Sequence, residues 1–209
     1  IKEIYQHSNV RVIYFGVDTD KFSLKKKKIH KGKTLKVLSL RNLEEIYNIE
    51  CIINMVEIVT NKGIDVELSI YSDGSIREKL EKLVIDKSLD QKVSFLGRYS
   101  EENILKILSE HDLYISMARS DAGIAASTAE AMSAGMICLI SNVAENSLWI
   151  SHNISGFLIK DDDHEDLANY VELIFNNNIN TEDFGIKARQ KIINYNSINK
   201  EMSKMSKIY

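Results

Sequence analysis

The sequence lacks proline entirely and has only two cysteines among its 209 residues. The absence of proline excludes proline-rich linkers, so helix ends and turns must be set by Gly, Asn, Asp and Ser. Cys51 and Cys138 both lie inside apolar segments. This placement predicts two buried free thiols rather than a disulfide or a metal site. Long apolar runs are also missing, so we expect neither a signal segment nor a membrane-spanning helix.

An excess of charge of one sign is lacking as well. The chain carries 27 basic and 30 acidic residues, a net charge of −3. A nucleic-acid-binding domain would show a clear basic excess, so we expect no nucleic-acid partner. Hydrophobic residues make up 44% of the sequence. A chain of this length buries about 70% of its unfolded surface, enough for a core without disulfides or metal ions.

Short apolar runs alternate with longer amphipathic ones. The short runs predict strands at Val10–Tyr14, Leu35–Leu38, Val66–Tyr71, Val93–Leu96, Leu113–Ser116, Met136–Ile140 and Gly156–Ile159. The amphipathic runs predict helices at Ile46–Asn61, Ser75–Asp86, Ser100–Ser109, Thr128–Ala134, His164–Phe175, Thr181–Tyr195 and Ser197–Lys207. Ser75 and Ser100 are the expected N-caps of their helices, and Gly135 the expected end of another.

This alternation is typical of βαβ units. We therefore expect an α/β fold, a Rossmann-like three-layer α/β/α sandwich with a parallel sheet of about six strands. No composition break interrupts residues 35–176. Residues 1–209 are accordingly predicted to form a single domain.

Ligands of an open parallel sheet bind outside the carboxyl ends of its strands. Arg41, Arg98 and Arg119 each follow a predicted strand, as does Asp121. Arginines bind oxyanions with two parallel hydrogen bonds, and helix N-termini offer free backbone N–H groups. This edge of the sheet therefore suits a phosphorylated ligand.

The densest signal lies in residues 120–135. Gly123, Ala125 and Ala126 are too small to shield the backbone where the helix begins, so a pyrophosphate could approach its N–H groups closely. Glu130, farther along that helix, could reach a ribose diol. The alternative is that the alanines only permit close helix–sheet packing and that Glu130 is an exposed helix residue.

Several segments together resemble one known family. They are Ile13–Asp18 with Phe22, Ile70–Leu80, Val93–Gly97, Asp112–Ser116, Glu130-Ala131-Met132 with Gly135, and Asn146–Leu158. In this order and spacing they resemble the C-terminal, donor-binding domain of group 1 (family 4) retaining glycosyltransferases of the GT-B architecture. The resemblance covers roughly residues 10–176.

The resemblance implies a hexosyltransferase-type enzyme that transfers sugar with retention from a UDP-, GDP- or ADP-sugar to a glycan or lipid-linked acceptor, without a metal ion. It implies that Arg41 contacts the pyrophosphate and that Glu130 binds the ribose hydroxyls. Asp121 is implied to be the catalytic acidic residue that contacts the transferred sugar. Further donor contacts are implied for Gly97, Arg98, Tyr99, Gly123, Ile124, Ala125 and Ala126. It also implies polysaccharide biosynthesis in the cytoplasm, with peripheral association at the inner face of the membrane as an option.

The sequence departs from the family pattern at two points in the site. The paired acids are usually separated by seven residues, whereas eight lie between Asp121 and Glu130, and the strict position is Ala122. The usual basic pair is represented by Arg41 alone, because the second position falls near residues 46–47 and holds no lysine. Arg119 and Lys160 are candidates for sharing the pyrophosphate charge.

Length is the third departure. Two Rossmann-like domains, the acceptor domain first, need roughly 350–400 residues. We therefore expect this chain to be the second domain alone, to bind nucleotide, and to catalyse transfer poorly without an N-terminal domain. A non-catalytic nucleotide-sugar-binding or scaffold domain, half of a nucleotide-sugar epimerase, and a phosphorylase are the alternatives.

Overall fold

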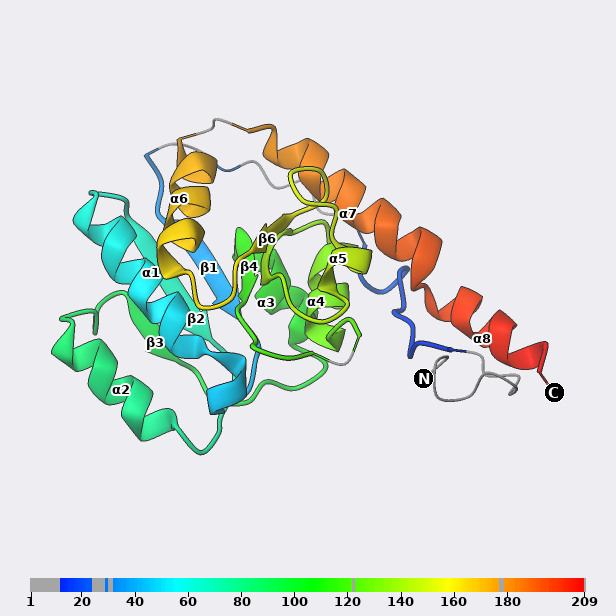
Figure 1. Ribbon diagram of the computed structural model, residues 1–209, viewed down its shortest axis with the longest axis horizontal. Coiled ribbons are helices and arrows are strands. Elements are labelled where there is room, and N and C mark those ends of the chain that lie inside the picture. The colour runs from blue at the N-terminus through cyan, green and yellow to red at the C-terminus, as the bar shows by residue number, and fades with distance from the viewer. Residues whose placement is uncertain (1–11, 24–28, 30–31, 122, 177–178, 209) are drawn as a thin grey trace.

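The computed structural model describes residues 12–23, 29, 32–121, 123–176 and 179–208. These residues form one six-stranded sheet between two layers of helices (Figure 1). The strands are β1 (Leu35–Ser39), β2 (Val66–Ile70), β3 (Val93–Phe95), β4 (Leu113–Ser116), β5 (Ile137–Ser141) and β6 (Phe157–Ile159). All neighbouring pairs are parallel, in the order β3-β2-β1-β4-β5-β6. The order reverses between β1 and β4, which is where such sheets open a crevice for ligands.

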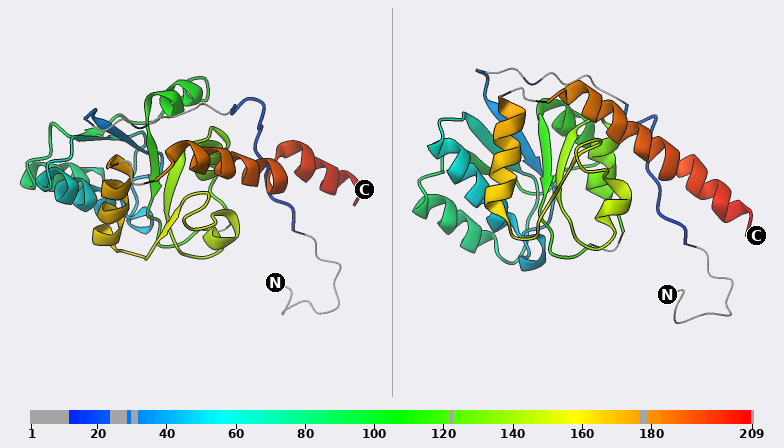
Figure 2. Two further views of the ribbon diagram at one scale, coloured as in Figure 1. Left: turned by 90° about the horizontal axis from the view of Figure 1, so that it is seen from above. Right: turned by 45° about the horizontal axis from the view of Figure 1, so that its top comes forward.

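Helices cover both faces of the sheet. One layer consists of α1 (Ile49–Asn61), α2 (Arg77–Asp86) and α6 (His164–Phe175). The other consists of α3 (Ile104–Glu110), α4 (Ala126–Ser133) and α5 (Asn146–Trp149), with α7 (Thr181–Tyr195) packed on α4. The last helix, α8 (Ile198–Ser206), continues from α7 and projects away from the body of the domain (Figure 2). The predicted three-layer α/β/α sandwich is confirmed.

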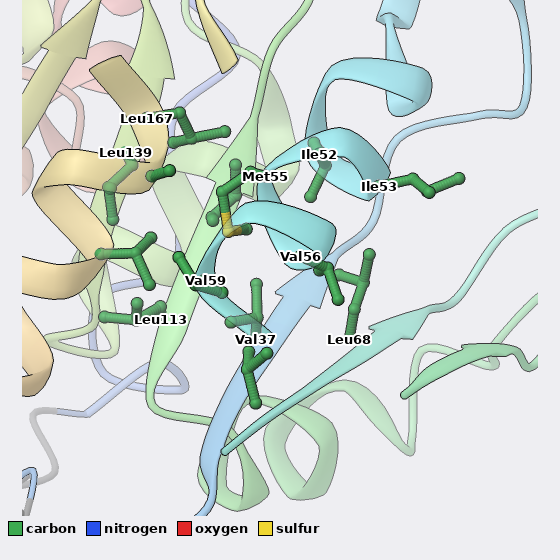
Figure 3. Close-up of a cluster of buried hydrophobic side chains, with 14 of the residues drawn as sticks. Val37, Ile52, Ile53, Met55, Val56, Val59, Leu68, Leu113, Leu139 and Leu167 are labelled. Atoms are coloured by element: carbon green, nitrogen blue, oxygen red, sulfur yellow. The ribbon is translucent and has the colours of Figure 1, made fainter. Parts of the chain in front are cut away.

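The core explains why the strands are mostly apolar. Alternate residues of β1 and its neighbours pack under α1 and α6 (Figure 3). The labelled side chains of that cluster include Val37, Leu68, Leu113 and Leu139 from strands and Met55, Val59 and Leu167 from helices. The intervening residues Leu38 and Tyr114 are fully buried on the other face. Burial on both faces is the property that the continuous apolar runs predicted.

Six of the seven predicted strands are confirmed, and the first is wrong where the structure describes it. Residues 12–14 are irregular, and residues 10 and 11 lie outside the described part. The hydrogen bonds here come from the C-terminal part of the chain, from α8 and from an isolated parallel bridge between Val17 and Ser197 at the junction of α7 and α8. The backbone N–H of Tyr14 donates to Oε2 of Glu201 at 2.9 Å. Val17 donates to the carbonyl of Asn196 and accepts from the N–H of Ile198, both at 2.8 Å.

The predicted serine caps are also wrong. Helix α2 begins at Arg77, and its preceding Ser75 donates both its N–H and its hydroxyl to the carboxylate of Glu44. Helix α3 begins at Ile104, three residues later than a cap at Ser100 requires. A carboxylate from a distant loop competes for Ser75, and sequence spacing cannot reveal such a competitor. By contrast, α6 and α7 have the predicted bounds, and α4 ends two residues before Gly135, whose φ is +76°.

Both cysteines are free and buried, as predicted. No helix within the described residues is long and apolar enough to span a membrane.

Candidate functional site

A cleft of about 390 Å³ opens at the carboxyl ends of β1 and β4, where the strand order reverses. Its walls come from four parts of the chain. These are the loop after β1, the short 3-10 helix η1 (Glu45–Tyr47), the loop after β3, and the β4–α4 connection with the start of α4. The lining residues are Leu40, Arg41, Asn42, Tyr47, Tyr99, Asp121, Gly123, Ala125, Ala126, Ser127 and Glu130.

Two of the lining side chains, those of Arg41 and Asp121, form a buried ion pair. Nη2 of Arg41 donates to Oδ1 of Asp121 at 2.5 Å, and the two side chains are only 9% and 7% exposed. The guanidinium carbon of Arg41 also lies 4.4 Å from the centre of the Tyr47 ring. A cation held between a carboxylate and an aromatic face is a fixed positive charge.

The start of α4 also lines the cleft. Its N-cap, Ala125, makes no side-chain capping bond, so no capping side chain accepts from the first-turn N–H groups of α4. Gly123 enters the turn with a φ of +79°, a conformation that favours glycine. Beneath the wall, the hydroxyl of Ser127 lies 2.8 Å from that of the fully buried Tyr114. These uncapped N–H groups and the guanidinium of Arg41 can both stabilise an anion in the cleft.

Two side chains that line the cleft, Tyr99 and Glu130, are partly withdrawn from solvent. Burial raises the pKa of the half-buried Glu130 carboxyl above its ordinary value, and the charge of Lys21 partly opposes this effect. Burial, with the charge of Glu130 as a smaller cause, raises the pKa of Tyr99 to about 12. Hydrogen bonds formed by a ligand with these groups gain strength from the reduced solvation.

The structure brings together seven of the ten predicted site residues: Arg41, Tyr99, Asp121, Gly123, Ala125, Ala126 and Glu130. Arg98 instead lines a neighbouring cavity of about 450 Å³ between the loop after β3 and α3, and Tyr99 borders both. Gly97 and Ile124 line neither of these two cavities as the structure describes them. Ile124 is buried in the core beside α4, and Gly97 turns the chain after β3 with a φ of +71°.

Four lining residues were not assigned from the sequence: Leu40, Asn42, Tyr47 and Ser127. Leu40 and Asn42 flank Arg41 directly after β1, and this adjacency could have indicated them. Asn42 is held by the hydroxyl of Ser72, which donates to its Oδ1 at 2.9 Å.

The two cations considered as partners of Arg41 lie elsewhere. Arg119 donates to Asp162 at 2.8 Å, to Oδ1 of Asn48 at 3.1 Å and to the carbonyl of Glu45 at 2.8 Å. Neither Arg119 nor the exposed Lys160 is among the described residues that line the cleft. Ala122, the position selected by strict seven-residue spacing, lies outside the described residues. Within the described part of the chain, no cluster of three His, Cys, Asp or Glu side chains could hold a metal ion.

Comparison with known sequences gives consistent matches. The family described as "Glycosyl transferases group 1" matches residues 20–191. The poly(ribitol-phosphate) alpha-N-acetylglucosaminyltransferase of Staphylococcus aureus (strain COL) is 30% identical over 146 residues, 69% of this chain and 29% of that protein. The UDP-Gal:alpha-D-GlcNAc-diphosphoundecaprenol alpha-1,3-galactosyltransferase of Escherichia coli is 25% identical over 226 aligned residues, 100% of this chain and 56% of that protein.

Solved structures share the fold. Anabaena HepE, crystallised in complex with UDP and glucose, superposes with a TM-score of 0.84 at 15% identity, over 95% of this chain and 56% of that chain. The chain therefore spans between 29% and 56% of the length of these three proteins.

Proposed function

The chain belongs to the group 1 glycosyltransferases, and from that premise we propose that its cleft between β1 and β4 binds the nucleotide-diphosphate sugar donor of a retaining transfer. The observation that carries the proposal is that the buried Arg41 guanidinium and the uncapped start of α4 line one cleft. A diphosphate is the ligand group that uses both features, since each stabilises oxyanions.

Arg41 and the backbone N–H groups at the start of α4 are the proposed diphosphate ligands. They would stabilise the charge that develops on the leaving nucleotide as the glycosidic bond breaks. Fixed cations and backbone dipoles do this without a metal ion, so the reaction is proposed to be metal-independent.

The other groups are assigned by their positions along the cleft. Glu130, one turn into α4, accepts hydrogen bonds from the ribose hydroxyls. Tyr99, which borders both cavities, marks the end proposed for the base, with Arg98 in the neighbouring cavity. Asp121 lies beside Arg41 and is the acidic group proposed to contact the transferred sugar.

The proposed donor cleft does not include a site for the sugar acceptor. The similar proteins carry names of enzymes acting on poly(ribitol-phosphate) and on a diphosphoundecaprenol-linked sugar. We therefore propose a glycan or lipid-linked acceptor, bound with the help of an N-terminal domain that these 209 residues do not include. On this proposal the chain binds donor nucleotide on its own and transfers sugar only together with that domain.

A thermal-shift panel of UDP, GDP, ADP and CMP tests donor binding. A nucleotide at 100 times its dissociation constant should stabilise the chain by about 2.7 kcal/mol. Glu130→Ala should abolish most of that shift, whereas the matched control Glu78→Ala, at an exposed position of α2, should leave it unchanged. No shift with any of the four nucleotides would refute the proposed function.

The ribose assignment has its own test. Replacing UDP by 2′-deoxy-UDP removes one hydroxyl of the diol. The wild-type chain should lose affinity, and Glu130→Ala should bind the two nucleotides equally. An equal loss in both chains would remove Glu130 from the ribose site.

A further inference from the structure

Tyr47 presents its ring to the cleft from a single helical turn. It is the last residue of η1, and the next residue, Asn48, has a left-handed φ of +50° that turns the chain into α1. None of the hydrogen bonds among the described residues uses the Tyr47 hydroxyl. The aromatic face is therefore the part of this side chain that has a partner, the guanidinium of Arg41.

The turn that carries this ring is fixed from outside the cleft. The backbone N–H of Arg119 donates to the carbonyl of Ile46, and its guanidinium to that of Glu45, both at 2.8 Å. The amide of Asn48 accepts from Arg119 at 3.1 Å and donates to Asp162 at 2.6 Å. These bonds hold η1 against the loops after β4 and β6, so the Tyr47 ring has a rigid support.

Arg41 needs such a support because it acts without a second cation. It is the one basic side chain among the described residues that line the cleft. Its one side-chain hydrogen bond among the described residues, to Asp121, does not by itself fix the plane of the guanidinium, and fixing a long side chain costs conformational entropy. The ring, at 4.4 Å, removes this freedom before any ligand arrives.

We propose that Tyr47 is a positioning residue: its ring fixes the guanidinium of Arg41 so that this cation meets the diphosphate of the donor already oriented. The inference rests on the proposed function and extends it by assigning a role to a side chain next to the phosphate site. A preoriented charge stabilises a developing charge without reorganisation at the moment of reaction. Arg119, through its hold on η1, contributes to this arrangement without touching the ligand.

The test compares Tyr47→Phe with Tyr47→Leu in titration calorimetry with UDP and with uridine. Tyr47→Phe keeps the ring and should bind both ligands like the wild type. Tyr47→Leu should bind UDP about 3- to 30-fold more weakly, the range expected for a lost cation–π contact. Its affinity for uridine, which has no phosphate, should not change. Tyr47→Met serves as the second variant if Tyr47→Leu does not fold.

The chain offers a matched control. Nζ of Lys191 lies 4.9 Å from the ring centre of Tyr195 on α7, outside the residues that line the cleft. Tyr195→Leu removes the same kind of contact and should leave the affinity for UDP unchanged.

Three results would overturn the inference. An equal loss of affinity for UDP and for uridine in Tyr47→Leu would mean that the ring only shapes the pocket. Loss of UDP affinity in Tyr47→Phe would assign the effect to the hydroxyl. Unchanged UDP affinity in Tyr47→Leu would show that Arg41 needs no such support. Failure of the wild-type chain to bind UDP, GDP, ADP and CMP would instead refute the proposed function.

Discussion

Arg41 and Asp121 are 80 positions apart in sequence, yet Nη2 of one lies 2.5 Å from Oδ1 of the other in a nearly unexposed pair. The pair joins the loop after β1 to the connection between β4 and α4, the two segments between which the crevice opens. Asp121 is therefore the counter-ion of Arg41 when no nucleotide is bound. A diphosphate entering the cleft meets a cation that already has one carboxylate partner.

Asp121→Asn should change the stability of the chain and its affinity for UDP in opposite directions. It should lower the free energy of unfolding by about 1.5–3 kcal/mol, the value of a hydrogen bond to a charged group. It should also strengthen UDP binding, because the carboxylate that repels the diphosphate is gone. Urea unfolding and titration calorimetry measure the two effects. Asp86→Asn, at the exposed end of α2, changes the net charge equally and should neither lower the stability nor change the affinity for UDP. Weaker UDP binding by Asp121→Asn would contradict the counter-ion role.

Glu130 should make the unfolding free energy depend on pH. Its pKa is raised in the folded chain because burial disfavours the carboxylate. The folded state therefore keeps this proton over a range where the unfolded state has lost it. Stability falls as the pH rises from the unfolded pKa, about 4.3, through the higher folded value. Above that range the penalty is fully present.

Glu130→Gln removes this group and keeps its size. The difference in unfolding free energy between Glu130→Gln and the wild type, both free of nucleotide, should grow in favour of the variant as the pH rises from about 4 to 7. Carboxylates present in both chains, such as Asp65 and Asp162 with lowered pKa values, cancel in that difference. Urea unfolding across the pH series provides the measurement, with Glu78→Gln as the exposed control. A constant difference would contradict the burial of Glu130.

The fold and the site differ in how far local sequence predicts them. The strands could be predicted because most of their residues are buried, on both faces throughout in β4 and β5, which leaves an apolar run of characteristic length. Arg41, Asp121 and Glu130 could be placed in one cleft because strand ends of a parallel sheet meet at one edge. The contact of Tyr47 with Arg41 could not, because it depends on how one helical turn is held by Arg119 from another loop.

The N-terminal segment is a second case in which local sequence does not predict the contact. An apolar run predicts that residues 12–14 are covered, and does not say by which element. In the folded chain Tyr14 bonds to Glu201 of α8, 187 positions away, and Val17 pairs with the junction between α7 and α8, whereas Val12 stays exposed. Only the folded chain shows that α8 and the α7–α8 junction, and not a strand of the sheet, take these backbone hydrogen bonds.

Both thiols should be unreactive in the native chain. Burial raises the pKa of Cys51 to about 12 and that of Cys138 further still. The thiolate is the reactive form, so at about pH 8 almost none is present in either side chain and access is blocked as well. An aromatic disulfide reagent should label neither residue in the native chain and both in denaturant. Rapid labelling of one cysteine under native conditions would show that its segment opens locally.

The junction between the N-terminal segment and α8 should be sensitive to a single methyl group. Gly16 has a φ of +69°, and a Cβ there would lie 2.8 Å from the Cα of Ile198, which is backbone and cannot rotate away. Gly63 has a similar φ of +79° with no atom within 4 Å of its would-be Cβ. Alanine at either position bears the cost of a left-handed conformation, about 1–2 kcal/mol. Gly16→Ala alone adds a steric clash, typically about 1–3 kcal/mol. Urea unfolding of the two variants isolates that steric contribution as the difference between their unfolding free energies.

Faster amide exchange at Val17 and Ile198 in Gly16→Ala, and not in Gly63→Ala, would locate the steric clash at this junction, because those two residues share the hydrogen bond beside it. Equal destabilisation by the two substitutions would mean that α8 shifts to accept the methyl group.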